Sequence, residues 1–156
     1  MSRDKLLAEY LQDISLEADF WGRSNCMLFV ARWVGIVRPS YDPSPWIGAH
    51  RSMADAARDI LKAGGMAKMF EREAAKAGLA EIAPEEAELG DVGMFEVKDA
   101  AAVIGVDIPE LSAGGKRTLY PGCIRTARHW AVRGGDGVGR VLAEGGRMQP
   151  IRVWRV

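Results

Sequence analysis

The stretch FWGRSNCMLFVARWVG, residues 20–35, changes from polar to apolar at Asn25-Cys26. Asparagine is a preferred helix N-cap, because its side-chain oxygen accepts a hydrogen bond from a backbone N–H group of the first turn. The apolar residues that follow recur at helical spacing and predict a helix over residues 26–37. This helix ends before Pro39, because the residue preceding a proline is disfavoured in a helix. Cys26 is then its first residue.

Two interpretations of Cys26 follow from this position. In the first turn of a helix, free backbone N–H groups and the positive end of the helix dipole favour a thiolate, which lowers the pKa of the thiol and makes it a nucleophile. The same N–H groups can stabilise an oxyanion. Alternatively, Cys26 is a structural residue, because free cysteine is among the most buried residue types.

Outward from this helix, the sequence predicts helices first and strands afterwards. Apolar residues at helical spacing predict three more helices, over residues 4–17, 52–63 and 66–77. Short apolar runs predict five strands, over residues 92–97, 119–126, 129–133, 138–143 and 150–156. The sequence GGDG at 134–137 predicts a hairpin turn, because glycine and Asp-Gly accept the positive φ that such turns need. Helices followed by an antiparallel sheet are typical of the α+β class.

The chain has 156 residues, which fits a single domain over 1–156 that buries its own core. Residues 98–117 are predicted to be an insertion, whose aliphatic residues fit a short helix and an extra strand equally well. Lys plus Arg equals Asp plus Glu at 21 each, so no net field attracts nucleic acid, and no nucleic-acid-binding module is recognisable. Nucleic acid is not expected as a partner.

The apolar segments of the chain are short. None approaches the roughly 20 residues that cross a bilayer, so no membrane insertion is expected. Charges interrupt the apolar positions of residues 1–14, which indicates an amphipathic helix and not a signal peptide. We therefore expect a protein that is made and kept in the cytoplasm, or is carried outward as part of an assembly.

The cysteines and histidines are few. Cys26 and Cys123 show no paired C-x-x-C spacing, which argues against both a disulfide framework and a zinc knuckle. A metal site built from these cysteines with His50 and His129 would have suitable residue types, but it lacks short chelating spacing. Neither a metal nor a cofactor is expected.

A thiol nucleophile needs a base, which is usually histidine. His50 ends a proline-rich loop and is predicted to be an exposed loop or cap residue. His129 begins the predicted strand HWAV ahead of the GGDG turn, from which it could project toward the helix of Cys26. The predicted catalytic pair is therefore Cys26 and His129.

Three motifs together resemble a known family. W-G-x-x-N-C at residues 21–26, G-D-V at 90–92 and H-W-A-V at 129–132 resemble the NlpC-type papain-like cell-wall endopeptidases. In that family a cysteine begins a helix, and a G-D-L/V strand precedes a strand with the catalytic histidine in H-V-G-I. A closer resemblance is to a branch found in phages and prophages, through the residues at 21–34, 63–65 and 154–156.

The resemblance implies a papain-like fold and a cysteine endopeptidase or amidase acting on peptide or amide bonds of peptidoglycan. Cys26 would attack the carbonyl, His129 would shuttle the proton, and Glu144 is a candidate for the third, orienting residue. It further implies a phage tail or gene-transfer particle, with the tail hub and other virion proteins as partners. The protein would then reside in the bacterial cytoplasm before assembly and in the virion afterwards.

The resemblance leaves two alternatives open. Residues 120–123, Tyr-Pro-Gly-Cys, could occupy the strand of the family's catalytic histidine, and His129 would then lie one strand later. The fold could also serve as a catalytically inactive structural adaptor of the tail hub, with the arginine-rich C-terminal sheet as its contact surface.

Overall fold

The computed structural model of the chain describes residues 1–98, 118–134, 137–145 and 148–156. The predicted insertion at 98–117 therefore lies, apart from Lys98, outside the described residues. Four α-helices occur, α1 (Arg3–Ser15), α2 (Cys26–Val37), α3 (Met53–Ala63) and α4 (Met66–Lys76), within the described ranges. These ranges also hold six strands, β1 (Ala80–Ile82), β2 (Val92–Met94), β3 (Gly122–Arg125), β4 (His129–Gly134), β5 (Gly137–Leu142) and β6 (Arg152–Arg155).

The four predicted helices are confirmed, and α2 has the predicted bounds. The predicted Asn25 cap is also confirmed, because its side-chain oxygen accepts hydrogen bonds from the backbone N–H groups of Met27 at 3.1 Å and Leu28 at 3.0 Å. The sequence did not predict β1 or the π-helical turn η1 (Phe20–Ser24), which leads into α2. Two short 3-10 turns, η2 (Ser44–Trp46) and η3 (Pro84–Glu86), complete the elements.

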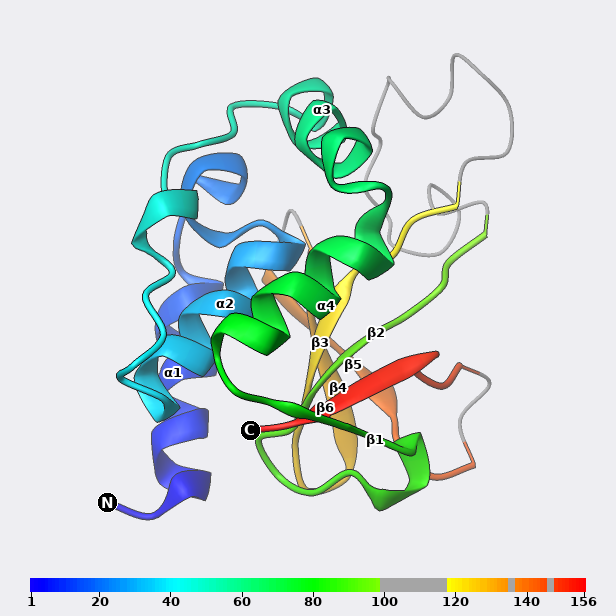
Figure 1. Cartoon of the computed structure of the whole chain (residues 1–156). Coiled ribbons are helices and arrows are strands. Elements are labelled where there is room, and N and C mark those ends of the chain that lie inside the picture. The colour runs from blue at the N-terminus through cyan, green and yellow to red at the C-terminus, as the bar shows by residue number, and fades with distance from the viewer. Residues whose placement is uncertain (99–117, 135–136, 146–147) are drawn as a thin grey trace.

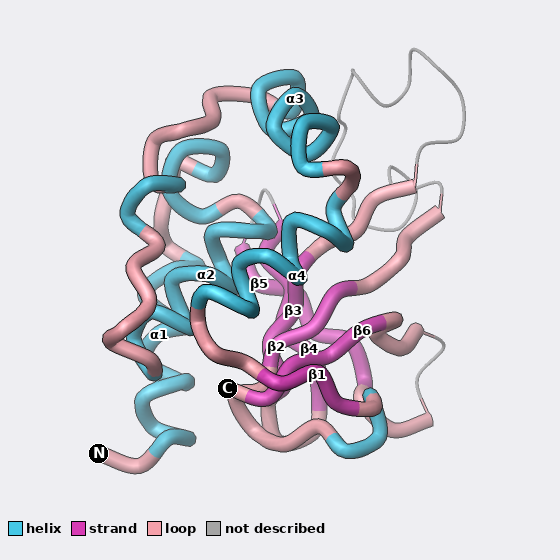
Figure 2. The backbone as a smooth tube through the Cα atoms, viewed as in Figure 1, coloured by secondary structure: helices cyan, strands magenta, loops and turns pink. Residues whose placement is uncertain are grey.

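The strands form one antiparallel sheet in the order β1-β6-β2-β3-β4-β5. β4 and β5 pair from His129 with Leu142 to Gly134 with Gly137, which confirms the hairpin predicted at GGDG. The helices lie together on one side of this sheet, with α2 and α4 crossing it (Figures 1 and 2). The chain therefore has the predicted α+β class, with N-terminal helices and a C-terminal antiparallel sheet.

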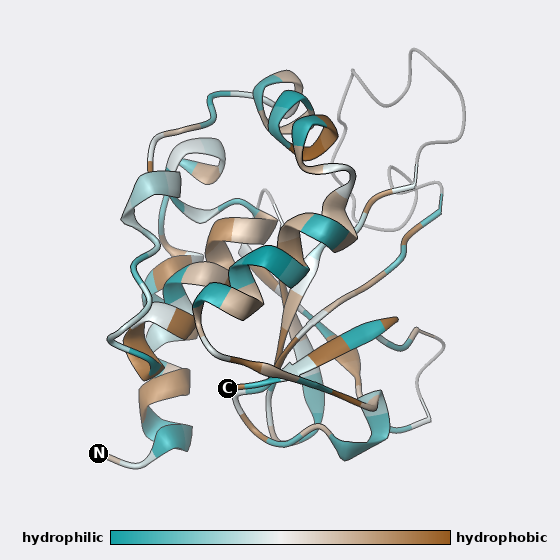
Figure 3. Cartoon of the chain, in the orientation of Figure 1, coloured by the Kyte–Doolittle hydropathy of each residue, from teal (hydrophilic) through white to brown (hydrophobic). Residues whose placement is uncertain are grey.

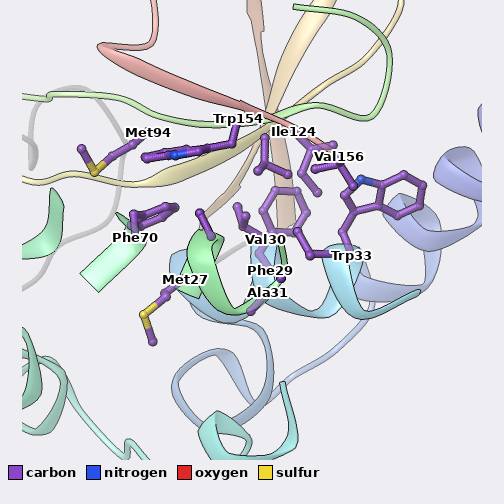
Figure 4. Packing of buried hydrophobic residues seen from close by; sticks show 14 of the residues in the cluster. Met27, Phe29, Val30, Ala31, Trp33, Phe70, Met94, Ile124, Trp154 and Val156 are labelled. Carbon is purple, nitrogen blue, oxygen red and sulfur yellow. The ribbon is translucent and has the colours of Figure 1, made fainter. Parts of the chain in front are cut away.

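The main core lies between α2 and the sheet. Phe29, Val30 and Trp33 of α2 lie beside the sheet residues Ile124 and Trp154 (Figure 4), and all are buried. The outer surface of α4 is hydrophilic (Figure 3), whereas its inner side buries Phe70, which stacks on Trp154 with ring centroids 5.8 Å apart. Burial of apolar surface along α2 is thus the main force that holds the helices on the sheet.

A smaller buried cluster contains Phe95, Val97, Cys123, Trp130 and Val153. Successive strand residues point to opposite faces, and Gly122 is the residue that faces α2. Cys123 therefore points away from α2. The sheet separates the two cysteines of the chain.

The G-D-V sequence at 90–92 joins α2, β2 and the C-terminal strand. The carboxylate of Asp91 is 1% exposed, and it accepts hydrogen bonds from the backbone N–H groups of Val156 at 3.0 Å and Glu88 at 2.8 Å. The carbonyl of Gly90 accepts a hydrogen bond from the indole of Trp33 at 2.8 Å. A buried carboxylate is stabilised by such donors, so this motif has a structural role.

Two arginines of the proposed contact surface are engaged within the chain. Arg152 forms ion pairs with Glu71 and Glu81, and its guanidinium lies 5.1 Å from the centre of the Trp154 ring. Arg155 pairs with Glu88 at 2.6 Å and with Asp91 at 3.3 Å. A partner that used these two guanidiniums would have to replace bonds that the fold already makes.

Substituting Gly122 by alanine is expected to destabilise the protein by about 2 to 3 kcal/mol, because the added methyl overpacks the contact between α2 and β3. A Cβ at Gly122 would lie 2.5 Å from Val30 Cγ2 and 2.6 Å from the carbonyl oxygen of Cys26. Urea unfolding measures the effect. Gly139→Ala is the matched control, because a Cβ there meets only the Val132 carbonyl oxygen, at 3.8 Å. Equal shifts of the two midpoints would contradict the close packing.

Candidate functional site

The sulfur of Cys26 lies where the first turn of α2 meets the start of β3. The residue keeps part of its surface accessible, but its surroundings are densely packed. Burial raises the pKa of the Cys26 thiol, and the backbone hydrogen bonds of Gly122, Cys26 and Met27, which lower this pKa, compensate only in part. The prediction that the helix start lowers the pKa of the Cys26 thiol is therefore wrong. The cost of removing water from the thiolate is larger than the stabilisation that the backbone N–H groups provide.

Because its pKa is raised, the Cys26 thiol needs a proton acceptor in order to react. A thiol with a raised pKa is protonated at neutral pH, so it is a poor nucleophile by itself. The same backbone N–H groups would favour a negative charge on or near the sulfur once it forms. Reaction at Cys26 therefore requires a proton acceptor that reaches the same space.

A cavity that is partly open to solvent lies beside Cys26. Its walls come from η1, α2, the segment before α3, α3, α4, the segment before β3 and the end of β4. Most of the lining residues are apolar, among them Phe20, Trp21, Met27, Ile60, Met69 and Leu119. The polar side chains among its described lining residues are Asn25, Cys26, His50, Tyr120 and Arg133.

His50 is a buried histidine that lines this cavity. It is 2% exposed, and its Nε2 lies 2.7 Å from Asp59 Oδ2 on α3. Its Nδ1 has no hydrogen-bond partner among the described residues. The prediction of an exposed loop or cap residue is wrong, because the loop folds inward and covers the imidazole.

Contacts on both sides hold the loop that carries His50. The backbone N–H of Gly48 donates to the Gly22 carbonyl of η1 at 2.6 Å, next to the turn that leads into α2. The Trp46 indole donates to Glu73 of α4 at 2.9 Å, and the Trp46 ring centroid lies 6.1 Å from that of His50. The loop therefore connects η1 to α4 and carries His50 to the cavity that both elements line.

Arg133 also lines the cavity. Its guanidinium lies 5.6 Å from the centre of the Phe20 ring and donates to the Glu17 carbonyl at 2.7 Å. These contacts tie β4 to η1 and to the segment after α1. Arg133 is thus a positive charge on the cavity wall and also a structural contact.

His129 lies outside this cavity. It begins β4 and lines an open groove between α1 and the β4–β5 hairpin, together with Gln12 and Arg140. Arg133, which does line the Cys26 cavity, is four residues further along the same strand, or roughly 13 Å away at about 3.3 Å per residue. The structure therefore does not bring the predicted pair, Cys26 and His129, together.

Strand register explains this separation. Cys123 of β3 pairs with Val132 of β4, so the start of β3 lies beside the end of β4 and far from His129. Of residues 120–123, which the alternative prediction places in the strand of the family's catalytic histidine, Gly122 and Cys123 lie in β3, and Tyr120 and Pro121 precede it. Gly122 contacts Cys26. Among the described side chains, no hydrogen bond joins Glu144 to either histidine.

The candidate metal ligands are likewise dispersed. Within the described ranges, no group of three or more His, Cys, Asp or Glu residues could hold a metal ion. Cys123 points to the other face of the sheet, and His129 lies in the separate groove.

No helix in the described part of the chain is both long and apolar enough to span a bilayer.

The comparisons with known proteins identify a family. A family model described as "Domain of unknown function (DUF6950)" matches residues 2–156. No curated protein and no solved structure matches the chain.

Substituting Asn25 by alanine is expected to destabilise the protein by about 1 kcal/mol, because the first turn of α2 loses its cap. It should also slow the alkylation of Cys26, since the amides around the sulfur lose their fixed orientation. Thermal unfolding and the rate of modification by iodoacetamide measure the two effects. The matched control is Ser2→Ala, which removes the cap of α1 but lies outside the Cys26 cavity. If Cys26 is alkylated at the wild-type rate in both variants, the cap has no influence on the site and the prediction is contradicted.

Proposed function

The chain belongs to this family of domains of unknown function, and we propose that it is a papain-like cysteine hydrolase that cleaves peptide or amide bonds through Cys26. One observation carries the proposal: Cys26 and a buried histidine with a free ring nitrogen line the same cavity. The NlpC-type form of the fold is supported by the helix that begins with cysteine and packs its first turn on β3, the strand that pairs with the G-D-V strand β2.

The chemistry follows from the groups around the sulfur. The sulfur attacks the carbonyl carbon of the scissile bond, and the negative charge on the carbonyl oxygen is stabilised by backbone N–H groups near Cys26. The amine leaves with a proton, and a thioester with Cys26 remains. Water then attacks the thioester, which releases the carboxylic acid and restores the thiol.

The substrate and the setting rest on the resemblance of the motifs. Peptidoglycan stem peptides are the proposed substrate, because the matched cysteine and G-D-V motifs resemble those of cell-wall endopeptidases. The carrier is proposed to be a phage tail or a gene-transfer particle, with the tail hub as neighbour. The protein would be made in the bacterial cytoplasm and would act from the assembled virion.

A second candidate function is a catalytically inactive adaptor of the tail hub. One observation favours it: burial raises the pKa of Cys26. The alternative form of the resemblance agrees with it, because Tyr120 would then take the place of the family's catalytic histidine. A partner that bound Arg152 or Arg155 would compete with the ion pairs that these residues form within the chain. An adaptor would tolerate Cys26→Ser with unchanged particle assembly and infectivity.

Iodoacetamide is expected to modify Cys26 at least about tenfold faster than Cys123 near neutral pH, because the two thiols differ in accessibility and surroundings. Cys123 is fully buried on the other face of the sheet, and burial raises the pKa of its thiol well above the usual value. Peptide mass spectrometry measures the extent at each site.

Two variants connect this reactivity to function. Cys26→Ser is expected to abolish hydrolysis of peptidoglycan fragments, whereas Cys123→Ser is expected to retain it. Equally slow labelling of the two thiols, or full hydrolysis by Cys26→Ser, would refute the hydrolase and leave the adaptor.

A further inference from the structure

We infer that His50, held by Asp59, is the base that accepts the proton of the Cys26 thiol. This inference rests on the proposed function, in which Cys26 is the nucleophile. It replaces the histidine that the sequence motifs suggested, His129, with one whose spacing from Cys26 matches no familiar pattern.

The first argument is the free nitrogen of His50. Buried polar atoms are nearly always hydrogen-bonded, because leaving one without a partner is destabilising. His50 is 2% exposed, yet its Nδ1 has no partner among the described residues. Since Asp59 occupies Nε2, Nδ1 is the polar atom that His50 offers to the cavity it shares with Cys26.

The second argument is the tautomer that Asp59 imposes. An ionised carboxylate only accepts hydrogen bonds, so the Nε2 that lies 2.7 Å from Asp59 Oδ2 must carry the hydrogen. The neutral ring then has its lone pair on Nδ1, which is the form that can accept a proton. Once His50 is protonated, the Asp59 carboxylate stabilises the imidazolium. Asp59 therefore acts as a positioning residue.

The third argument is that no other described group of the cavity can serve. Tyr120 is a phenol, whose neutral oxygen is a poor proton acceptor. Arg133 is a cation that has no proton-accepting atom, and Asn25 uses its side-chain oxygen to cap α2. Asp59 on α3 contacts the imidazole, and the other titratable or charged side chains that line the cavity are Cys26 on α2, Tyr120 before β3 and Arg133 on β4.

The proton transfers balance over one turnover. The thiol proton of Cys26 moves to His50 Nδ1 as the sulfur attacks the substrate carbonyl. The leaving amine takes this proton, which returns His50 to its neutral form. In the second half, water gives a proton to His50 as it attacks the thioester, and His50 returns a proton to the departing sulfur. No oxidant, metal or further reactant is needed.

Alkylation of Cys26 by iodoacetamide between pH 5 and 9 tests the assignment in the full-length chain. In the wild type, the rate is expected to rise with pH in a step that depends on His50, because a protonated imidazole cannot accept the thiol proton. In His50→Gln, this rise should disappear, and the rate at pH 7 should fall at least about tenfold. It should recover only at higher pH, where the buried thiol ionises without help.

Two further variants complete the set. Asp59→Asn should lower the rate several-fold and shift the profile, because the amide also offers Nε2 a donor and no longer fixes the tautomer. Asp59 is 37% exposed, so this variant is expected to fold even if His50→Gln does not. His129→Gln is the matched control and should keep the wild-type profile.

A second measurement needs no substitution. Long-range ¹H–¹⁵N NMR spectra report the tautomer of each histidine, and His50 is expected to carry its hydrogen on Nε2. Alkylation of Cys26 should shift the ring signals of His50 and leave those of His129 unchanged. The opposite tautomer, or a shift confined to His129, overturns the assignment.

The outcomes separate this inference from the proposed function. A reactive Cys26 with active hydrolysis, but with unchanged profiles in folded His50→Gln and Asp59→Asn, overturns the base assignment and leaves the hydrolase intact. A wild-type Cys26 that iodoacetamide does not modify overturns both, because no reactive thiol then exists for a base to serve.

Discussion

The arrangement of this protein depends on the direct contact between the first turn of α2 and the start of β3. The contact requires glycine at position 122, because any Cβ there would overlap Val30 and the carbonyl of Cys26. With the backbones this close, α2 buries its apolar side against the sheet, and the amide region of β3 reaches the Cys26 sulfur. The absence of a side chain at position 122 thus permits both the packing of the core and the position of Cys26 beside β3.

The same contact makes the Cys26 thiol harder to ionise. Close packing removes water from the sulfur, and desolvation opposes the thiolate more strongly than the surrounding amides favour it. A site of this kind stays inert until a base takes the thiol proton, and inside an apolar cavity the resulting ion pair would be stronger than in water. The loop that ends at His50, fixed between η1 and α4, supplies an imidazole to that cavity without exposing it to solvent.

Features fixed by local chemistry were predictable from the sequence. The Asn25 cap, the end of α2 before Pro39 and the GGDG hairpin each depend on a few neighbouring residues, and each is confirmed. β1 and η1 are too short to give a periodic pattern. The inward position of His50 and its bond to Asp59 depend on tertiary packing of a loop, and no spacing rule connects these two residues. The raised pKa of the Cys26 thiol could not be predicted for the same reason. The helix dipole, which lowers the pKa, follows from local sequence, whereas the burial that raises it depends on tertiary packing.

The most direct test of the account is a crystal structure of the protein trapped with a peptide aldehyde, which forms a hemithioacetal with an active-site cysteine. The account predicts an adduct on Cys26, with its oxygen about 3 Å from backbone N–H groups at the start of α2 or β3 and with the His50 Nδ1 within about 3 to 4 Å of the sulfur or that oxygen. An adduct in which the His50 ring remains more than about 8 Å away, or in which another histidine approaches the sulfur, would contradict it.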